Sequence, residues 1–407
     1  MKKAKIVLVG IGGYGNNYPT LYIDYPELYA HKAEFVAVVD PFAEKAPKYD
    51  WIREKHIPVF GTLDDFYRQG SADLAVISTP IALHKGQALT AVENGSHVLC
   101  EKPLTATVED TYELIEAAKT YGRKIGVGFQ WSYTQAITRL KSDIIAGKFG
   151  APLELKVLSC EQRCDAYYAS WKGKIKTDQG DYILDSIVRN ASSHYLHNLF
   201  YVLGDTPSGA AMPDTVSAEV YRAKEIESFD TVVMKGSFSS GATFWFGATH
   251  SNDKYDLLQF IFRFEKADIC FNMTQKDDHM YAVYPDGKSQ DYGELRGPGV
   301  RNMKFGTMID ASLDDRMAVP CTPESVLPHV KVCNGLFSRV GITTLPSGLT
   351  IHTGIKPGTY VEGLCDIMER CFRDGLLFHE AGVDWAAVPE TFSPGEITRF
   401  EGVRYLN

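Results

Sequence analysis

A glycine-rich segment near the start of the chain has the spacing of a phosphate-binding turn. Gly10, Gly12 and Gly15 fit the pattern G-x-G-x-x-G, with Gly13 and Tyr14 between them, directly after a short apolar run. Such a turn lets the backbone approach a pyrophosphate and points the unpaired N–H groups of the next helix at it. Its place after a predicted strand indicates dinucleotide binding.

Asp40 closes the next predicted strand, residues 35–39, where a carboxylate can accept hydrogen bonds from ribose hydroxyls. Its charge would repel a 2′-phosphate, so the sequence favours NAD over NADP as the cofactor. Pro19 and Pro26 predict a broken helix between the turn and this strand. The alternative is a plain turn followed by a surface aspartate.

Polar residues also follow the third and fourth apolar runs. In a parallel sheet the carboxyl ends of the strands form the ligand-binding edge. A lysine at that edge could donate a hydrogen bond to a substrate hydroxyl, although an isolated Glu-Lys-Pro is more simply a loop with a solvated ion pair. The residues predicted to lie there are Thr79, Pro80, His84, Glu101 and Lys102.

A second polar group lies in the middle of the chain. Asn190, His194 and His197 are spaced i, i+4 and i+7, which would place them on one face of a helix. Such a face could carry an active site, whereas a lone histidine is more often structural. His194 and His197 could also ligate zinc, but no clear third ligand is present, so no metal site is expected.

An aromatic and cationic segment precedes this group. Aromatic faces beside hydrogen-bond donors suit a sugar or polyol ring, and the alternative is an aromatic patch at a subunit interface. Gln130, after the last parallel strand, is expected to contact the cofactor. The residues nominated for the substrate wall are Trp131, Arg163, Tyr168, Trp171, Lys172 and His197.

The order of the patterns predicts two domains. Residues 1–128 alternate short apolar runs with amphipathic helices, which is typical of a doubly wound parallel sheet. Residues 129–407 are expected to form an α+β domain with a large, mostly antiparallel open sheet, because strand patterns follow one another without long helices. Residues 286–304 are expected to be rich in loops.

Composition narrows the class of protein. The 407 residues carry a formal net charge of −9, which argues against nucleic acid as the main partner. No apolar stretch approaches the roughly 20 residues that span a bilayer, and no signal peptide is recognisable. The sequence therefore predicts a cytoplasmic protein whose eight cysteines are reduced thiols.

Together these motifs resemble the glucose-fructose oxidoreductase and inositol dehydrogenase family, called Gfo/Idh/MocA. The resemblance covers the N-terminal 205 residues well. It implies a Rossmann domain, an open antiparallel sheet and a homodimer or homotetramer built on that sheet. It also implies that Lys102 orients the substrate and that His194 transfers the proton.

The chain departs from the family pattern at three positions. Asn190 stands where aspartate is common, His197 replaces another aspartate, and Ile81 replaces an asparagine. Asn190 can hold the imidazole of His194 but cannot stabilise its charged form. Asp185 or Asp181 could supply the missing carboxylate from a neighbouring turn.

The expected reaction is hydride transfer between nicotinamide and a hydroxyl-bearing carbon of a sugar, polyol or sugar derivative, with catalytic Lys102, His194 and Asn190. Two alternatives stay open. One is a lyase or glycosidase that uses NAD transiently with no net redox change, which would accumulate no free NADH. The other is a non-catalytic dinucleotide-binding regulator.

Overall fold

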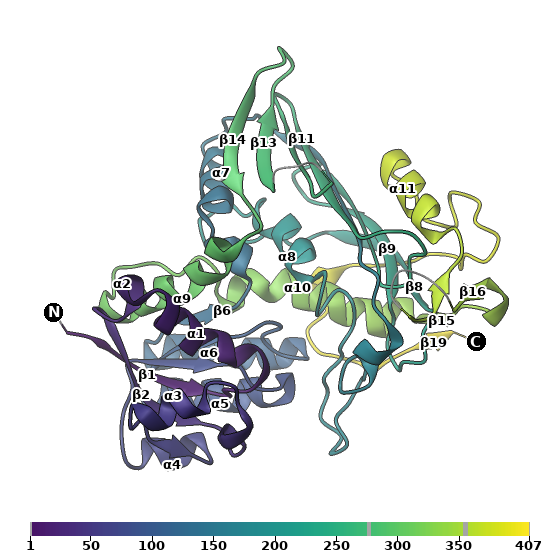
Figure 1. Ribbon diagram of the computed structural model, residues 1–407. Helices are drawn as coiled ribbons and strands as arrows, with labels where there is room; N and C mark the ends of the chain where they lie inside the picture. Colours follow the sequence, from purple (N-terminus) through teal and green to yellow (C-terminus); the bar gives the residue numbers. More distant parts are fainter. Residues whose placement is uncertain (1, 275–277, 353–356, 407) are drawn as a thin grey trace. The chain divides into compact units, whose positions relative to one another are not determined.

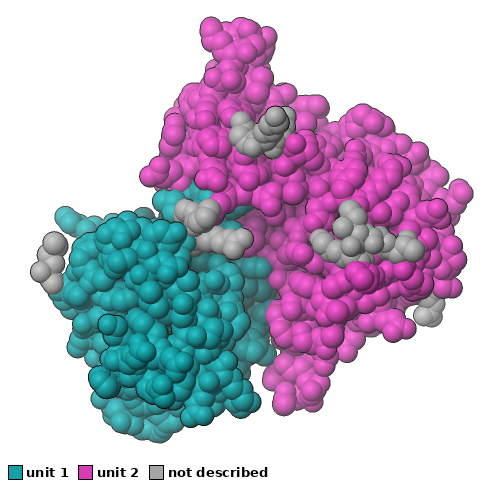
Figure 2. All heavy atoms as spheres, viewed as in Figure 1, with its two compact units in different colours: residues 1–134, 298–326 teal, residues 135–297, 327–407 magenta. Residues whose placement is uncertain are grey.

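A computed structural model describes residues 2–274, 278–352 and 357–406. It divides into two compact units, coloured separately in Figure 2. Unit 1 comprises residues 1–134 and 298–326, and unit 2 comprises residues 135–297 and 327–407. The sequence prediction placed a single boundary at residue 128. The structure adds a later segment to the first unit because that segment packs against the parallel sheet.

The centre of unit 1 is a parallel sheet of six strands within the described residues, in the order β3-β2-β1-β4-β5-β6. Most of its strand residues are buried, as expected for apolar runs covered on both faces. The order reverses direction between β1 and β4, which creates the switch point where such sheets bind ligands. The strands are β1 (Ala4–Val9), β2 (Ala33–Val39), β3 (Val59–Phe60), β4 (Leu74–Ile77), β5 (His97–Cys100) and β6 (Ile125–Val127).

Helices connect these strands, as Figure 1 shows in purple and blue. The first connection breaks at Pro26, as predicted, because proline cannot continue the hydrogen bonding of the preceding helix. α5 contacts β4, β5 and α6. The helices of this part are η1 (Gly13–Asn16), α1 (Asn17–Asp24), α2 (Pro26–Tyr29), η2 (Ala43–Lys45), α3 (Tyr49–Glu54), α4 (Leu63–Tyr67), α5 (Ile81–Glu93), α6 (Val108–Tyr121) and η3 (Gln130–Tyr133).

Helix α9 (Pro298–Leu313) completes unit 1 and contacts β1, β4 and β5. Phe305 packs on Tyr18 of α1 and Tyr29 of α2, with ring centroids 5.2 and 5.1 Å apart. Lys32 forms an ion pair with Asp310 at 2.6 Å. A helix encoded almost 300 residues after β1 is thus part of the dinucleotide-binding unit.

The prediction that residues 286–304 are rich in loops is wrong. They contain strand β14 (Ser289–Glu294) and the first half of α9. Only Tyr292 of this strand is buried, and the other positions are polar or glycine. Its sequence therefore lacks the apolar alternation that predicts a strand. Gly297 and Pro298, which suggest a loop, instead lie at the point where α9 begins.

Unit 2 is built on a mixed, mostly antiparallel sheet of eleven strands within the described residues, which confirms the predicted fold class. The order is β14-β13-β12-β11-β7-β10-β9-β8-β15-β19, with β18 paired to β8. Beyond β14, the strands are β7 (Pro152–Cys160), β8 (Thr215–Arg222), β9 (Thr231–Ser237), β10 (Thr243–Thr249), β11 (Leu257–Phe264), β12 (Asp268–Asn272), β13 (His279–Val283), β15 (Ile342–Thr344), β18 (Glu390–Phe392) and β19 (Tyr405–Leu406).

A smaller sheet pairs β16 (Thr350–Ile351) with β17 (Tyr360–Val361). α10 spans the point where the chain passes from unit 1 to unit 2. The helices of this part are α7 (Gln135–Ile145), η4 (Asp165–Tyr168), α8 (Ser193–Tyr201), α10 (Pro323–Gly335), the π-helix η5 (Leu336–Val340), η6 (Ser347–Leu349), α11 (Leu364–Asp374) and η7 (Pro394–Glu396).

Helix α11 covers part of the large sheet and contacts β7 and β10. Its apolar residues join a buried cluster around Trp245 of β10. The Trp245 ring packs on Phe372 with centroids 5.7 Å apart, and its Nε1–H donates to the Leu376 carbonyl at 2.9 Å. This side chain therefore contributes both apolar burial and a satisfied buried hydrogen bond to the core of unit 2.

No helix among the described residues is long and apolar enough to cross a membrane. All eight cysteines lie in described parts of the chain, and none forms a disulfide there.

Substituting Trp245 by alanine should lower the free energy of unfolding of unit 2 by about 3–5 kcal/mol, because it leaves a large cavity. Trp171 is 40% exposed in the same unit and serves as the matched control. Trp171→Ala should change stability by no more than about 0.5 kcal/mol. Urea unfolding monitored by circular dichroism measures both, and equal losses would contradict this account of the core.

Candidate active site

The glycine turn follows β1 directly and closes against the end of β4. Gly10 has φ +82°, and a Cβ there would lie 2.9 Å from Cγ2 of Thr79. At Gly15 a Cβ would overlap the carbonyl oxygen of Gly10. Both positions therefore need glycine for the turn itself. A Cβ at Gly12 or Gly13 would meet no protein atom within 4 Å, so the backbone there faces open space.

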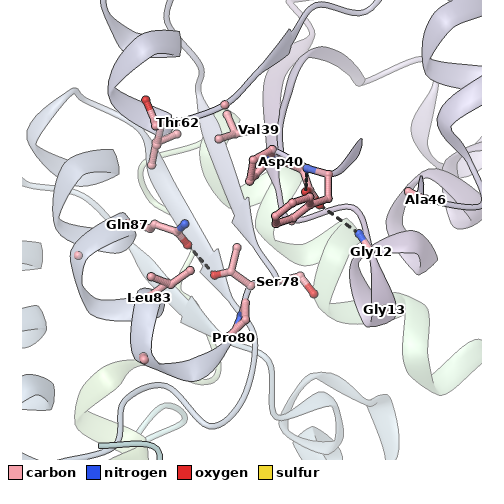
Figure 3. A pocket seen from close by; sticks show the side chains of 18 of the residues that line it. Gly12, Gly13, Val39, Asp40, Ala46, Thr62, Ser78, Pro80, Leu83 and Gln87 are labelled. Carbon is pink, nitrogen blue, oxygen red and sulfur yellow. Dashed lines mark hydrogen bonds between the residues drawn. The ribbon is translucent and has the colours of Figure 1, made fainter. Parts of the chain in front are cut away.

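Asp40 lies against this turn. Its Oδ2 accepts from the backbone N–H of Ile11 at 3.0 Å and of Gly12 at 3.4 Å, and its Oδ1 accepts from Phe42 N at 2.8 Å. The carboxylate at the end of β2 thus holds the end of β1 in place. Figure 3 shows Asp40 and Gly12 joined in this way.

A cavity of about 830 Å³ opens beside Asp40. Its walls come from the carboxyl ends of β1, β2 and β4 and from the first turns of α4 and α5. Figure 3 shows Val39, Thr62 and Leu83 among the side chains around it. The predicted cofactor residues that line it are Gly10, Gly12, Gly13, Asp40, Thr79 and Pro80. Tyr14 lies in η1 and is partly exposed.

His84 is buried on α5 and does not line the cavity. Its Nε2 lies 2.8 Å from the Thr79 carbonyl and its Nδ1 lies 3.0 Å from the Pro103 carbonyl. Burial lowers the pKa of its imidazole, against the effect of the two carbonyl oxygens. His84 therefore joins the loop after β4 to the loop after β5. This geometry supports an indirect role in shaping the cofactor site.

Glu101 and Lys102 follow β5. Glu101 is buried, and its carboxylate accepts from the hydroxyl of Tyr18 at 2.6 Å and forms an ion pair with Lys304 of α9. Lys102 is partly buried and precedes the cis peptide bond to Pro103. Tyr18 and Lys304 were not found from the sequence, because only the fold brings α9 beside β5.

The catalytic candidates of unit 2 lie around the start of α8. The helix begins at Ser193, so His194 lies in its first turn and Asn190 lies in the turn before it. Asn190 Nδ2 donates to Asp185 Oδ1 at 3.2 Å. Of the two aspartates considered from the sequence, Asp185 is thus the one that contacts Asn190, and Asp181 is exposed.

Asp185 also connects this turn to the predicted substrate wall. Its Oδ2 accepts from the backbone N–H of Gly173 at 2.6 Å. Gly173 immediately follows Trp171 and Lys172, so one buried carboxylate holds both the segment before α8 and the aromatic segment. From the sequence, Asp185 was considered only as one of two sources of a carboxylate for His194, and its contact with the aromatic segment was not predicted.

His197 lies in the interior of unit 2, with its ring 5.5 Å from that of Tyr201 and 6.4 Å from that of His329. Burial lowers the pKa of its imidazole well below the usual value, and the nearby His329 and Lys141 act in the same direction. A neutral, buried His197 favours a structural role over the predicted contact with substrate.

Two cationic side chains of the aromatic segment lie close to the ring of Tyr167. The guanidinium of Arg163 lies 5.3 Å from the ring of Tyr167, and the ammonium of Lys172 lies 4.8 Å from it. Lys172 also lies 5.3 Å from the ring of Trp171. The structure therefore brings together three of the predicted wall residues. Sequence reasoning did not nominate Tyr167, the ring that they share.

Tyr168 points to a different partner. Its hydroxyl lies 2.5 Å from Nδ1 of His250, which directly follows β10. Burial raises the pKa of Tyr168 well above the usual value, so it remains a neutral hydrogen-bonding group.

In unit 1, Gln130 and Trp131 begin η3, where Gln130 is partly exposed and Trp131 is buried. Among the described residues, no group of His, Cys, Asp and Glu could hold a metal ion.

Comparison with known proteins adds an independent observation. The family model for Gfo/Idh/MocA, described as an oxidoreductase family with an NAD-binding Rossmann fold, matches residues 4–129. These residues contain the glycine turn, the cavity and the loop that bears Lys102. Residues 4–129 belong to the Gfo/Idh/MocA oxidoreductase family.

Curated relatives match parts of this chain. A 1,5-anhydro-D-fructose reductase of Ensifer adhaerens is 30% identical over 37% of this chain and 43% of its own length. A 2,7-anhydro-N-acetylneuraminate hydratase of Mediterraneibacter gnavus is 25% identical over 66% of this chain and 68% of its own. This chain thus spans less than half of the length of the reductase that it matches.

The fold also matches that of solved structures. The WlbA dehydrogenase from Bordetella pertussis, crystallised with NADH and UDP-GlcNAcA, is 21% identical, with a TM-score of 0.64 over 82% of this chain and 94% of its own. At this identity the match establishes the fold, which includes both the Rossmann unit and the large sheet.

The residues of the Gfo/Idh/MocA turn fit the dinucleotide that the family description names. Gly12 and Gly13 present backbone to open space where a pyrophosphate would need close approach. The side-chain oxygen of Asn16, in η1, is buried and has no hydrogen-bond partner in the described part of the chain. These groups would hold the phosphates, and Asp40 would face the ribose of the adenosine half.

The two kinds of glycine in the turn predict separable effects. Gly15→Ala should lower the melting temperature and abolish NADH binding, because its Cβ would overlap the Gly10 carbonyl oxygen. Gly12→Ala should leave the melting temperature unchanged and weaken NADH binding at least tenfold, because only the cofactor would meet its Cβ. Differential scanning fluorimetry and NADH fluorescence titration measure the two effects. Undiminished NADH binding by Gly12→Ala would contradict this placement of the pyrophosphate.

Proposed function

We propose that the protein is an NAD-dependent oxidoreductase that transfers a hydride between nicotinamide and a hydroxyl-bearing carbon of a sugar, polyol or sugar derivative. The observation that carries this proposal is the open glycine turn at the switch point of the parallel sheet, with Lys102 directly after β5 at the same edge of the sheet. Ligands bind at this edge of doubly wound sheets.

The chemistry divides between the cofactor and this chain's own side chains. Bound NAD supplies the hydride acceptor at nicotinamide C4. Lys102 donates a hydrogen bond to the substrate oxygen and stabilises the negative charge that develops on it. His194 takes the hydroxyl proton as a general base.

Asn190 and Asp185 support the histidine from the turn before α8. The Asn190 side chain donates to Asp185, so its amide is held in one orientation. The buried carboxylate of Asp185 accepts this hydrogen bond from the position where the family often places aspartate. This arrangement supports a positioning role for Asn190 and makes a compensating carboxylate available in the same turn.

The wall around Tyr167 supports a substrate rich in hydroxyl groups. Trp171 offers an aromatic face, and Tyr168 offers a phenol hydroxyl. Hydrogen-bond donors beside them come from Arg163 and Lys172. The reductase relative is named for an anhydro sugar, which agrees with this class. A homodimer or homotetramer formed through the large sheet of unit 2 is part of the same proposal.

A second function has a specific observation in its favour. The relative with the longer match is named a hydratase, and hydration involves no net oxidation or reduction. Transient oxidation of a sugar carbon, followed by return of the hydride, would suit the same residues. Absorbance at 340 nm during turnover separates the two functions, because only the dehydrogenase accumulates free NADH. A chain that binds NADH and acts on no carbohydrate would instead be a regulator.

The roles of Lys102 and His194 lead to one kinetic prediction. With a carbohydrate that the wild type oxidises, found by screening sugars, inositols and sugar acids, Lys102→Ala and His194→Ala should each lower kcat at least a hundredfold. His197→Ala is excluded as a control because it would disturb the core. Tyr121→Ala, at the exposed end of α6, should retain wild-type kcat. Unchanged turnover in both active-site variants would refute the assignment.

The role of Asp40 leads to a prediction about cofactor choice. Asp40→Asn keeps an acceptor oxygen for the turn and removes the charge that repels a 2′-phosphate. The ratio of the dissociation constants for NADPH and NADH should fall at least tenfold. Asp64 lines the same cavity, and Asp64→Asn is the matched control. An unchanged ratio in Asp40→Asn would show that Asp40 does not face the 2′ position.

A further inference from the structure

An ion pair is buried beneath the carboxyl end of β5. The ammonium of Lys304 contacts Oε1 of Glu101, and the two side chains are 2% and 9% exposed. The hydroxyl of Tyr18 donates to the same Oε1 at 2.6 Å. Lys304 also lies 3.4 Å from the Gly128 carbonyl and 4.6 Å from the ring of Tyr14. These contacts all lie within unit 1.

The ammonium form of Lys304 is favoured at this position. Burial disfavours the ammonium, but the attraction of Glu101, together with the contact with Tyr14, outweighs it and raises the pKa of Lys304 above the usual value. A buried ion pair contributes little net stability, because the cost of removing both charges from water offsets their attraction. Helix α9 is also fixed by apolar packing and by the pair Lys32–Asp310. The buried pair is therefore not needed merely to attach the helix.

The place of Glu101 in the sheet relates it to one half of the cofactor. The cavity beside Asp40 reaches from the end of β2 to the end of β4, and the carboxylate of Asp40 on its β2 side suits the adenosine half. The nicotinamide half then extends toward the ends of β4 and β5, where Glu101 and Lys102 directly follow β5. The nicotinamide ring is positively charged in NAD⁺ and neutral in NADH, so a carboxylate beneath it would favour the oxidised form.

We propose that Lys304 sets the relative affinity for NAD⁺ and NADH by neutralising the carboxylate of Glu101. Lys304 is a positioning and charge-balancing residue that acts through Glu101. This inference rests on the proposed function, because it needs a nicotinamide at the end of β5. With the pair intact, the charge of Glu101 is neutralised by Lys304. The site then binds the oxidised and reduced nicotinamide rings with more similar affinities, so the hydride can pass in either direction.

The test measures binding to the full chain and does not require the substrate. Isothermal calorimetry at pH 8 gives the dissociation constants of NAD⁺ and NADH for each variant. In K304M the uncompensated carboxylate should favour NAD⁺, and the ratio of the NADH constant to the NAD⁺ constant should rise about tenfold. A tenfold change in this ratio lowers the potential of the bound two-electron couple by about 30 mV.

Three further variants test the sign of the predicted change in the ratio. E101Q leaves the ammonium uncompensated, so the same ratio should fall below that of the wild type. The double variant E101Q/K304M carries neither charge, and its ratio should return toward that of the wild type. K304R retains the positive charge and should restore the ratio.

The matched control is K32M, which removes the lysine of the other ion pair that α9 forms. It tests whether loosening the helix is enough to change the ratio, and the expected result is no change. If K304M does not fold, the opposite shift in E101Q still tests the proposal, because a purely structural pair predicts no signed change in the ratio.

The outcomes separate this inference from the proposed function. Opposite shifts in K304M and E101Q, cancelled in the double variant, support it. An unchanged ratio in folded K304M, or equal shifts in K304M and K32M, would overturn the inference alone. Failure of the wild type to bind either NAD⁺ or NADH would overturn the proposed function and this inference with it.

Discussion

The ion pair between Glu101 and Lys304 joins the carboxyl end of β5 to a helix encoded 203 residues later. It lies beside Tyr18, which belongs to the helix that follows the glycine turn. The pair therefore connects three separate parts of unit 1 at the edge where the cofactor is proposed to bind. Lys102 is the next residue after Glu101. Its orientation therefore depends on where these contacts hold the backbone of Glu101.

The sequence was sufficient to predict those elements whose physical signal lies within a short stretch of chain. The helix at Val108–Tyr121 has an N-capping side chain in Thr107 and a left-handed glycine after it, and the structure has a helix there. The glycine turn is equally local, because a Cβ at Gly15 would overlap the carbonyl oxygen of Gly10, only five residues earlier. The buried strands β1, β2, β4 and β5 are apolar runs that only a covered parallel sheet explains.

The rest depends on contacts that no local pattern encodes. β14 is a polar strand stabilised by pairing with β13, and α9 begins with proline and glycine, so the segment resembles a loop in sequence. Asn190 has helical spacing to His194 but lies in a turn held by Asp185. Lys304 carries no signal of its own, because a lysine in a helix is usually solvated. Only the return of α9 to unit 1 reveals its partner.

The central claim is that this edge of the sheet directs the nicotinamide half over β4 and β5. A crystal structure of the protein with NAD⁺ tests it most directly. The account predicts the pyrophosphate against Gly12 and Gly13, the adenosine ribose at Asp40, and the nicotinamide ring beside Glu101 and Lys102. A dinucleotide bound with its nicotinamide in the cavity beside Asp40, or away from the end of β5, would contradict it.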